Sequence, residues 1–398
     1  MHGAADPSCW NPPLESPKLE FVDRMRGAAI LLVIAVHFTQ VFSDPLVRAA
    51  GSVGQVGVQL FFVASAFTLC RSADQRGAAG RAAEAHPLRN FYIRRLLRIA
   101  PLYWLALALY TLRGVLRGET LFFTPLNIGA NALFVHGLVP SANNTIVPGG
   151  WSIGAEMLFY LMFPFIFAAL AQGWQRRGAR AVMLGLALAV LAATAWHFGY
   201  RIVMGRWIHN NFFAYCVIAA QLPVFMIGIA WYFAVLRAGA FAPRLARDAA
   251  GAALFLGGCA AIILTDSSPL FGLMPIAAGI GSVFAGQLLR LARRGTSWLA
   301  AIGKVSYSIY VLHFLVTWEL IPLFLARLGG NLRYEALAIV PLYAASVLLL
   351  LGLGRITARV IEEPAAILAR QIIRASEKRS ETRAFASAQK TFVPPLFY

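Results

Sequence analysis

Long apolar runs recur along this chain and are separated by short polar stretches. Each run is about 17 to 25 residues long, the length with which a helix crosses a lipid bilayer. The runs lie at 25–43, 51–70, 99–117, 150–171, 181–199, 212–236, 249–265, 270–289, 303–325 and 335–355. A shorter run at 126–139 predicts a re-entrant or interfacial piece. The pattern therefore predicts an all-α polytopic membrane protein with about ten transmembrane helices.

Composition leaves little sequence for a soluble domain. The chain is 59% hydrophobic and 13% charged, whereas about 25% of the residues of a soluble protein are charged. We expect a cytoplasmic N-terminal segment at 1–20, a transmembrane domain at 21–365 and a cytoplasmic tail at 366–398. The tail is polar with mixed charge, which predicts disorder. The first segment has no apolar core, so we expect no cleavable signal peptide and a first apolar run that remains as an anchor.

Positive charge is distributed unevenly between alternate loops. The net charge is +18. With a cytoplasmic N-terminus, 27 of the 35 lysines and arginines fall on the cytoplasmic side and 7 fall in the opposite loops. This positive-inside bias predicts that both termini are cytoplasmic. Because the charges occupy short loops between apolar runs, the pattern argues against nucleic-acid binding.

The cysteines indicate neither a metal site nor a disulfide framework. The chain has four of them, Cys9, Cys70, Cys216 and Cys259, and their spacing matches no metal-binding motif. Most lie in or beside apolar runs, which favours small apolar packing residues. We therefore expect no bound metal.

Ionisable side chains inside apolar runs are costly and suggest function. Glu156 and Glu319 are the carboxylates in such positions, and His37 lies deep in the first run. Arg26 precedes His37 by eleven residues, which places both on nearly one helix face, about 16 Å apart along the axis. An anion held at Arg26 could extend a long arm to the imidazole, and coenzyme A has this shape. The alternative is a histidine bonded within the bundle and an arginine that sets topology.

A second basic cluster begins the third run. Arg94, Arg95 and Arg98 lie where a cytoplasmic loop enters a helix, and their guanidinium groups suit bidentate phosphate binding. A topology signal with lipid headgroup contacts is the alternative. Glu156 enters the fourth run from the opposite side, near Tyr160. It could orient or charge-balance a catalytic group such as His37, or it could serve a structural partner.

Read in order, these stretches resemble the acyltransferase-3 family of membrane O-acyltransferases over about residues 20–365. Each motif is weak alone, and their order along the chain makes the resemblance specific. One departure is Ala66, where the family has glycine. The positions that match the family's motifs are Arg26 and His37, then Phe61, Phe62 and Ser65, then Arg95, Arg98, Ile99, Pro101, Tyr103 and Trp104, then Trp151, Ser152, Glu156, Phe159 and Tyr160, then Gly303, Ser306, Tyr307, Tyr310 and His313, and finally Glu362 and Pro364.

The resemblance implies transfer of an acyl group, expected to be acetyl, from cytoplasmic acyl-CoA to a hydroxyl group. The implied acceptor is a cell-surface polysaccharide, lipopolysaccharide or other glycolipid, and the implied location is the bacterial inner membrane. The implied catalytic residues are His37 and Glu156, and the cofactor phosphates would bind Arg26, Arg95 and Arg98. The residues expected to support the site or the acceptor are Ser65, Tyr103, Trp151, Ser152, Tyr160, Tyr310 and His313.

Several alternatives stay open at this point. His37 could act as a general base on the acceptor hydroxyl, or it could carry the acyl group covalently. The acceptor could be a macrolide or another secondary metabolite instead of a glycan. A secondary transporter or flippase is a different class, and it would favour inverted repeats and broken helices. No internal repeat is visible in the sequence.

Overall fold

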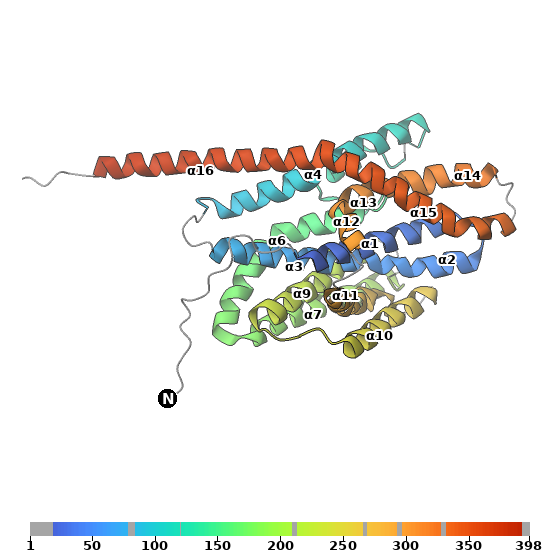
Figure 1. Cartoon of the computed structure of the whole chain (residues 1–398), viewed down its shortest axis with the longest axis horizontal. Coiled ribbons are helices and arrows are strands. Elements are labelled where there is room, and N and C mark those ends of the chain that lie inside the picture. The colour runs from blue at the N-terminus through green and yellow to red at the C-terminus, as the bar shows by residue number, and fades with distance from the viewer. Residues whose placement is uncertain are drawn as a thin grey trace, which may run out of the picture.

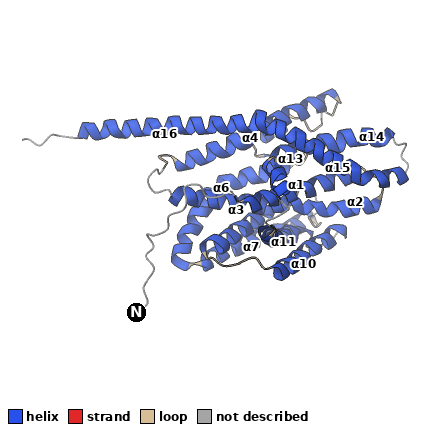
Figure 2. Cartoon of the chain, in the orientation of Figure 1, coloured by secondary structure: helices blue, strands red, loops and turns tan. Residues whose placement is uncertain are grey.

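The computed structural model describes residues 19–78, 84–119, 121–208, 213–265, 269–292, 297–327 and 332–391. Within these ranges the chain forms helices and connecting loops without strands, as Figure 2 shows. The predicted all-α class is therefore confirmed. Cys9, most of the N-terminal segment 1–20 and the last part of the tail lie outside the described residues.

The helices follow one another with short connections. In chain order they are α1 (Glu20–Thr39), α2 (Pro45–Ser52), η2 (Val53–Gln55), α3 (Val56–Ala78), α4 (Pro87–Leu116), α5 (Pro125–Ala132), η3 (His136–Leu138), α6 (Gly150–Arg177), α7 (Ala179–Met204), α8 (Phe213–Cys216), α9 (Ile218–Tyr232) and η4 (Phe233–Arg237). They continue with α10 (Leu245–Leu264), η5 (Pro269–Leu273), α11 (Met274–Leu291), α12 (Ser297–Lys304), α13 (Ser306–Phe314), η6 (Leu315–Leu320), α14 (Ile321–Arg327), α15 (Leu332–Thr357), η7 (Ala358–Glu362) and α16 (Glu363–Thr391).

In the part of the chain that the structure describes, nine helical stretches are long and apolar enough to cross a membrane. They are Pro45–Arg76, Pro87–Leu116, Gly150–Arg177, Ala179–Met204, Phe213–Arg237, Leu245–Leu264, Leu270–Leu291, Ser306–Arg327 and Leu337–Ser380. Each overlaps one apolar run of the sequence. The remaining run lies on α1, which is not among the nine and carries Asp23, Arg24 and Arg26 near its start. The multi-pass membrane architecture is therefore confirmed.

The short run at 126–139 does not form a membrane-crossing helix. It folds as α5 and the single turn η3, which are joined by a residue with left-handed backbone, Phe134 (φ 60°). The expectation that this run does not form a further transmembrane helix is therefore confirmed. His136 of η3 is fully buried and its Nε2 contacts the carbonyl oxygen of Gly150 at 2.9 Å, so the piece packs against the first turn of α6.

The central helix α1 packs closely against α12, and it also contacts α3, α11 and α13. Figure 1 shows α1 in the middle of the bundle, with α16 on one side and α7 and α10 on the other. A Cβ atom added to Gly27 would lie 2.0 Å from the carbonyl oxygen of Leu299, and one added to Gly303 would lie 1.8 Å from that of Asp23. Glycine thus lets the two backbones touch, as small residues do between membrane helices.

Ala66, the departure from the family motif, lies in a similarly close contact. Its side chain is fully buried on α3 and faces Gly228 of α9. A Cβ atom on Gly228 would lie 2.9 Å from the Ala66 methyl group. The glycine on α9 therefore provides the space that the methyl group on α3 occupies.

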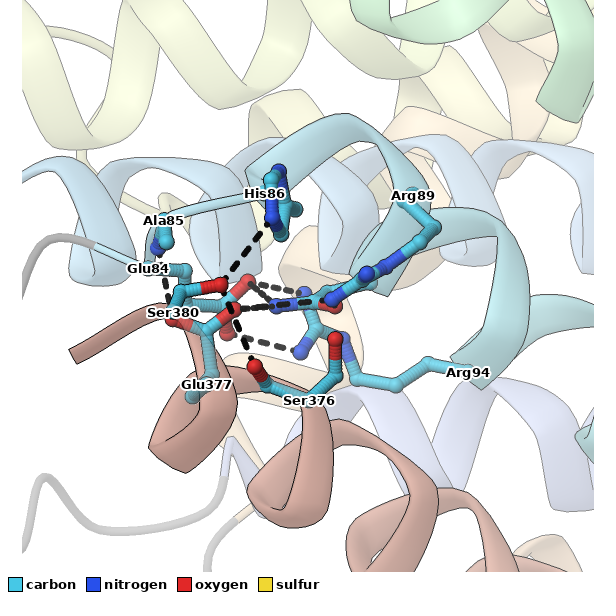
Figure 3. A network of polar contacts seen from close by, with 9 residues as sticks. Glu84, Ala85, His86, Arg89, Arg94, Ser376, Glu377 and Ser380 are labelled. Carbon is cyan, nitrogen blue, oxygen red and sulfur yellow. Dashed lines mark hydrogen bonds and ion pairs between the residues drawn. The ribbon is translucent and has the colours of Figure 1, made fainter. Parts of the chain in front are cut away.

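The prediction of a disordered tail at 366–398 is wrong as far as Thr391, because α16 continues to that residue. The segment is rich in alanine, arginine, glutamate and lysine, which are strong helix formers. In Figure 1, α16 runs beside α4 and extends beyond its first turn. Polar contacts join the two helices in Figure 3: Glu377 accepts hydrogen bonds from the backbone N–H of Ala85 (2.6 Å) and the side-chain amide of Asn90 (2.8 Å).

Candidate active site

Two cavities lie inside the bundle and share part of their lining. The first, which we call the basic cavity, has a volume of about 80 Å³ and is lined by Arg26, Ser65, Arg95, Arg98, Glu156 and Tyr160, among others. The second, the histidine cavity, has a volume of about 630 Å³, and its lining includes His37. Val58 and Tyr310 line both. The two cavities therefore adjoin at these residues.

One helix supplies a key residue to each cavity. Arg26 and His37 are both half-buried on α1, and each faces a different cavity. The Arg26 guanidinium donates to Thr68 Oγ1 at 3.1 Å and contacts Asp23 at 3.3 Å. The eleven-residue spacing thus places the two side chains on one helix at two adjoining cavities.

The three arginines near the start of α4 do not share one environment. Arg94 points away from the basic cavity and donates two hydrogen bonds to the Glu84 carboxylate, at 2.7 and 3.1 Å, visible in Figure 3. Glu84 lies in the loop before α4. Burial raises the pKa of Glu84, but the hydrogen bonds from Arg94 and Asn90 outweigh it, so the pKa lies below its ordinary value.

Arg95 and Arg98 instead line the basic cavity. Within the described ranges, neither forms an ion pair with a carboxylate. The Arg95 guanidinium lies 5.7 Å from the ring centre of Phe91 and 5.6 Å from that of Tyr160. Aromatic rings hold this cation in place while leaving its N–H groups available. Two guanidinium groups at one cavity without a carboxylate partner suit a bound anion.

Glu156 lies in the basic cavity and not beside the imidazole. Its Oε1 accepts hydrogen bonds from Ser65 (2.5 Å) and Tyr160 (2.5 Å). The hypothesis that Glu156 orients His37 is therefore wrong, because the contacts of this carboxylate are on the arginine side of the shared lining. The sequence could not decide this, since α1 and α6 are far apart along the chain.

His37 is surrounded by aromatic rings in the histidine cavity. The ring centres of Phe314, His313 and Trp318 lie 4.4, 5.1 and 5.8 Å from that of His37. Its Nδ1 lies 3.2 Å from Gln40 Oε1. With the amide oxygen of Gln40 as the acceptor, Nδ1 carries the proton. The lone pair of Nε2 is then the one that can act as a base.

The junction of the cavities is held by hydrogen bonds between α6 and α13. The hydroxyl groups of Ser152 and Tyr310 are 2.6 Å apart, and Tyr310 also donates to the carbonyl oxygen of Gly149 at 3.0 Å. Gly149 has a left-handed backbone (φ 72°), which favours glycine there. Trp151, on the next turn, lines the histidine cavity. Ser152, Tyr310 and Trp151 are therefore at the site, as the resemblance implies.

Two of the expected residues line neither cavity. Tyr103 is fully buried, donates to Asn131 Oδ1 at 2.8 Å and stacks on His136. It therefore holds α5 and η3 in place and does not line the acceptor side of the site. His313 is also fully buried. Its Nδ1 donates to the carbonyl oxygen of Tyr310 at 2.6 Å. Its ring packs against that of His37, with 5.1 Å between the ring centres.

Sequence reasoning missed an ionic cluster at the histidine cavity. Arg113, in the last turn of α4, and Arg117, which directly follows that helix, contact the two oxygens of Glu319 at 2.6 and 2.7 Å. Arg113 also contacts Glu119 at 3.4 Å. Glu319 was visible as a carboxylate in an apolar run, but its partners became apparent only when the structure brought η6 beside α4.

The described residues contain no group of three or more histidine, cysteine, aspartate or glutamate side chains placed to hold an ion. Cys70, Cys216 and Cys259 are unpaired and buried, which agrees with the packing role expected for them.

Fold and site together define a polytopic membrane protein with a polar site inside its helical bundle. Residues 19–354 match the family model described as the acyltransferase domain. The chain belongs to the acyltransferase-3 family and is therefore a membrane acyltransferase. No curated protein and no solved structure matches the chain.

Proposed function

We propose that this chain moves an acyl group, in the first instance acetyl, from acyl-CoA to a hydroxyl group of a cell-surface glycan or glycolipid. The observation that carries the proposal is the pair of adjoining cavities. One provides unpaired guanidinium groups for an anionic donor, and the other provides an imidazole and room for an acceptor. A protein that bound only an anion, or only a sugar, would not need two adjoining cavities.

On this proposal, the phosphate groups of the donor bind at the basic cavity. Its phosphates meet Arg26, Arg95 and Arg98, whose forks suit bidentate contacts. The pantetheine arm then passes Val58 and Tyr310 and brings the thioester to His37. The route follows α1, along which Arg26 and His37 are separated by about 16 Å.

His37 acts as the general base in the transfer step. Its Nε2 takes the proton of the acceptor hydroxyl while that oxygen attacks the thioester carbonyl carbon. The new C–O bond forms, the C–S bond breaks, and the departing thiolate takes the proton from the imidazolium. The products are an ester and free coenzyme A. Proton transfer by a positioned histidine contributes roughly 10²- to 10⁴-fold in rate.

Glu156 is a positioning residue in this scheme. It holds the hydroxyl groups of Ser65 and Tyr160 and supplies negative charge among three arginines. When no donor is bound, attraction to that charge offsets the repulsion between the guanidinium groups. Gln40 has a comparable role at the other cavity, where it fixes the tautomer of His37.

We further propose that the basic cavity opens toward the cytoplasm, with both termini on that side, in a bacterial inner membrane. The excess of lysine and arginine in the corresponding loops supports this orientation. Acyl-CoA would then enter from the inside, and the glycan would meet the histidine cavity from the outside. Mass spectrometry of surface glycans from cells with and without the chain would identify the acceptor as the one that loses an acyl mass.

The central test uses purified protein in lipid nanodiscs with radiolabelled acetyl-CoA and a glycan acceptor extracted from the surface of the native cell. The wild-type protein should form a labelled ester, and His37→Ala should abolish it without changing the elution profile of the protein. His197→Ala is the control, because His197 is another histidine of an apolar helix but lines neither cavity. Full activity of His37→Ala would remove His37 from the mechanism, and movement of unmodified glycan across vesicles would favour the flippase.

A further inference from the structure

A third cavity, which we call the lateral groove, lies between α4, α6 and the segment that joins α5 to η3. Its volume of about 590 Å³ lies within the range of ligand pockets, roughly 300 to 1,000 Å³. Leucine, isoleucine, valine, methionine and phenylalanine make up most of its lining. Four of these residues, Leu88, Leu96, Leu133 and Leu161, are 40 to 73% exposed. In a membrane protein, the groove therefore opens to the surrounding lipid.

The groove has nearly the depth of one leaflet. Along α4 its lining runs from Leu88 to Leu96, eight residues or about 12 Å, and the hydrocarbon of one leaflet is about 15 Å deep. Phe134, which precedes η3, also lines the groove and packs on Tyr103, with 5.0 Å between the ring centres. Tyr103 lies further along α4 than Leu96, so Phe134 and its neighbours close the groove at its deeper end.

A cation lies at the opposite end of the groove. Arg89, in the first turn of α4, lines the groove and its side chain is 42% exposed. Among the residues that the structure describes, its guanidinium donates one hydrogen bond, to Asn90 Oδ1 at 3.1 Å. The carboxylate of Glu377 lies 3.8 Å away, which is beyond hydrogen-bond distance. Arg89 thus retains N–H groups for an anion at the membrane surface.

The lateral groove adjoins the basic cavity. Arg95 and Tyr160 line both, and the Arg95 guanidinium lies over the Tyr160 ring, 5.6 Å from its centre. These two side chains separate polar space inside the bundle from lipid outside it. An occupant of the groove would cover them on the lipid side.

From these observations we infer that the lateral groove binds an anionic phospholipid of the cytoplasmic leaflet, with its phosphate at Arg89 and one acyl chain along α4. A guanidinium suits a phosphate group, and an apolar groove one leaflet deep suits the chain. In the proposed orientation the start of α4 is cytoplasmic, on the side where basic residues attract anionic lipids. This site takes neither donor nor acceptor and goes beyond the proposed function, and the bound chain seals the basic cavity from the bilayer at Arg95 and Tyr160.

Photo-crosslinking tests the site in the full-length protein. Nanodiscs of dioleoyl phosphatidylcholine would contain a trace of a probe lipid with a diazirine near the end of one acyl chain. The two probes have identical chains, and one is phosphatidylglycerol while the other is phosphatidylcholine. Peptide mass spectrometry should place the phosphatidylglycerol adduct between α5 and η3 and on the adjoining turn of α6, several-fold above the phosphatidylcholine adduct. Equal labelling by both probes, or adducts spread evenly over the lipid-facing helices, would overturn the inference.

A substitution at the rim tests the headgroup contact. Arg89→Ala should lower labelling by phosphatidylglycerol about fivefold, as expected for loss of one basic residue near the membrane surface, and should leave labelling by phosphatidylcholine unchanged. Arg176→Ala is the matched control, because Arg176 is an exposed cation in the last turn of α6 and does not line the groove. An unchanged preference for phosphatidylglycerol in Arg89→Ala would refute the phosphate contact.

A substitution inside the groove tests the path of the chain. Leu96→Trp adds an indole to an exposed position of the lining and should remove the adduct between α5 and η3 for both probes. Leu188→Trp is the matched control, since Leu188 is 58% exposed on α7 and does not line the groove. Both variants should elute as the wild-type protein does. Persistence of the phosphatidylglycerol adduct in Leu96→Trp would refute the path. None of these measurements uses acyl-CoA, so their outcome does not depend on the acyl transfer reaction.

Discussion

The adjacent arginines Arg94 and Arg95 provide an internal control for the donor site. They have the same side chain and are consecutive residues of α4, but they face different surroundings. Arg94 is paired with Glu84, whereas Arg95 lines the basic cavity without a carboxylate partner in the described ranges. Replacing each by alanine should therefore weaken donor binding in one variant only.

The structure sets the size of the expected difference. A hydrogen bond between a guanidinium and an anion contributes about 1.5 to 3 kcal/mol, so Arg95→Ala should raise the Kd of acyl-CoA about ten- to a hundredfold. Arg95→Lys should recover part of this, because an ammonium keeps the charge but loses the planar fork. Arg94 is paired with Glu84 and lies outside the lining of the basic cavity. Arg94→Ala removes no contact to the donor and should change the Kd of acyl-CoA by less than about fivefold.

The assay is equilibrium binding of a non-hydrolysable acyl-CoA analogue to protein in nanodiscs, measured calorimetrically. Salt dependence adds a second measure, because a lost contact to phosphate should reduce the weakening of binding at high salt. Equal effects of Arg94→Ala and Arg95→Ala would show that only the overall positive charge matters. An unchanged Kd in Arg95→Ala would refute phosphate binding in the basic cavity.

Two further substitutions test the frame of the site. Glu156→Gln should lower kcat about tenfold or more at saturating donor, since a neutral amide replaces the charged acceptor of two hydroxyl groups; a near-normal rate would limit Glu156 to a packing role. Gly27→Ala should lower the melting temperature, because its Cβ would lie 2.0 Å from the Leu299 carbonyl oxygen and relieving such overpacking costs about 1 to 3 kcal/mol. Gly257→Ala, with open space at its Cβ, is the control, and equal melting temperatures would contradict the close contact.

The fold was predictable because lipid imposes one dominant rule. A backbone inside a bilayer must satisfy its own hydrogen bonds, so an apolar run of sufficient length can only be a helix. Every such run in this sequence is mostly helical in the structure. The same rule does not apply to polar segments outside the bilayer, so it did not predict the helix α16. Its residues are strong helix formers, and its position beside α4 depends on contacts such as that between Glu377 and Asn90, which join residues far apart in the sequence.

The site was predictable in its members but not in their grouping. Motifs selected Arg26, His37, Arg95 and Glu156, and the structure places all four at the two cavities. Motifs gave no reason to place Glu156 apart from His37, because grouping depends on how helices distant in sequence pack.

Hydrogen-bond partners distinguish residues that the motifs treat alike. Tyr103 and Tyr310 are both motif tyrosines, yet Tyr103 supports η3 and Tyr310 forms part of the junction. The difference follows from their partners, an asparagine of α5 for one and a serine of α6 for the other. A sequence records neither partner. Residue type and spacing thus identify candidates, and packing decides their roles.

The junction at Val58 and Tyr310 explains how one site could serve two substrates from opposite faces of a membrane. On the proposed function, the phosphates of the donor stay at the arginines of the basic cavity and the glycan stays in the histidine cavity. Only the pantetheine arm with its thioester has to pass the shared lining, where the Tyr310 hydroxyl is already engaged by Ser152 and Gly149. Neither the donor phosphates nor the glycan then needs to cross the apolar interior, whose penalty for charged groups is severe. The uncharged arm and the acyl group that it carries are the parts of the donor best suited to make that passage.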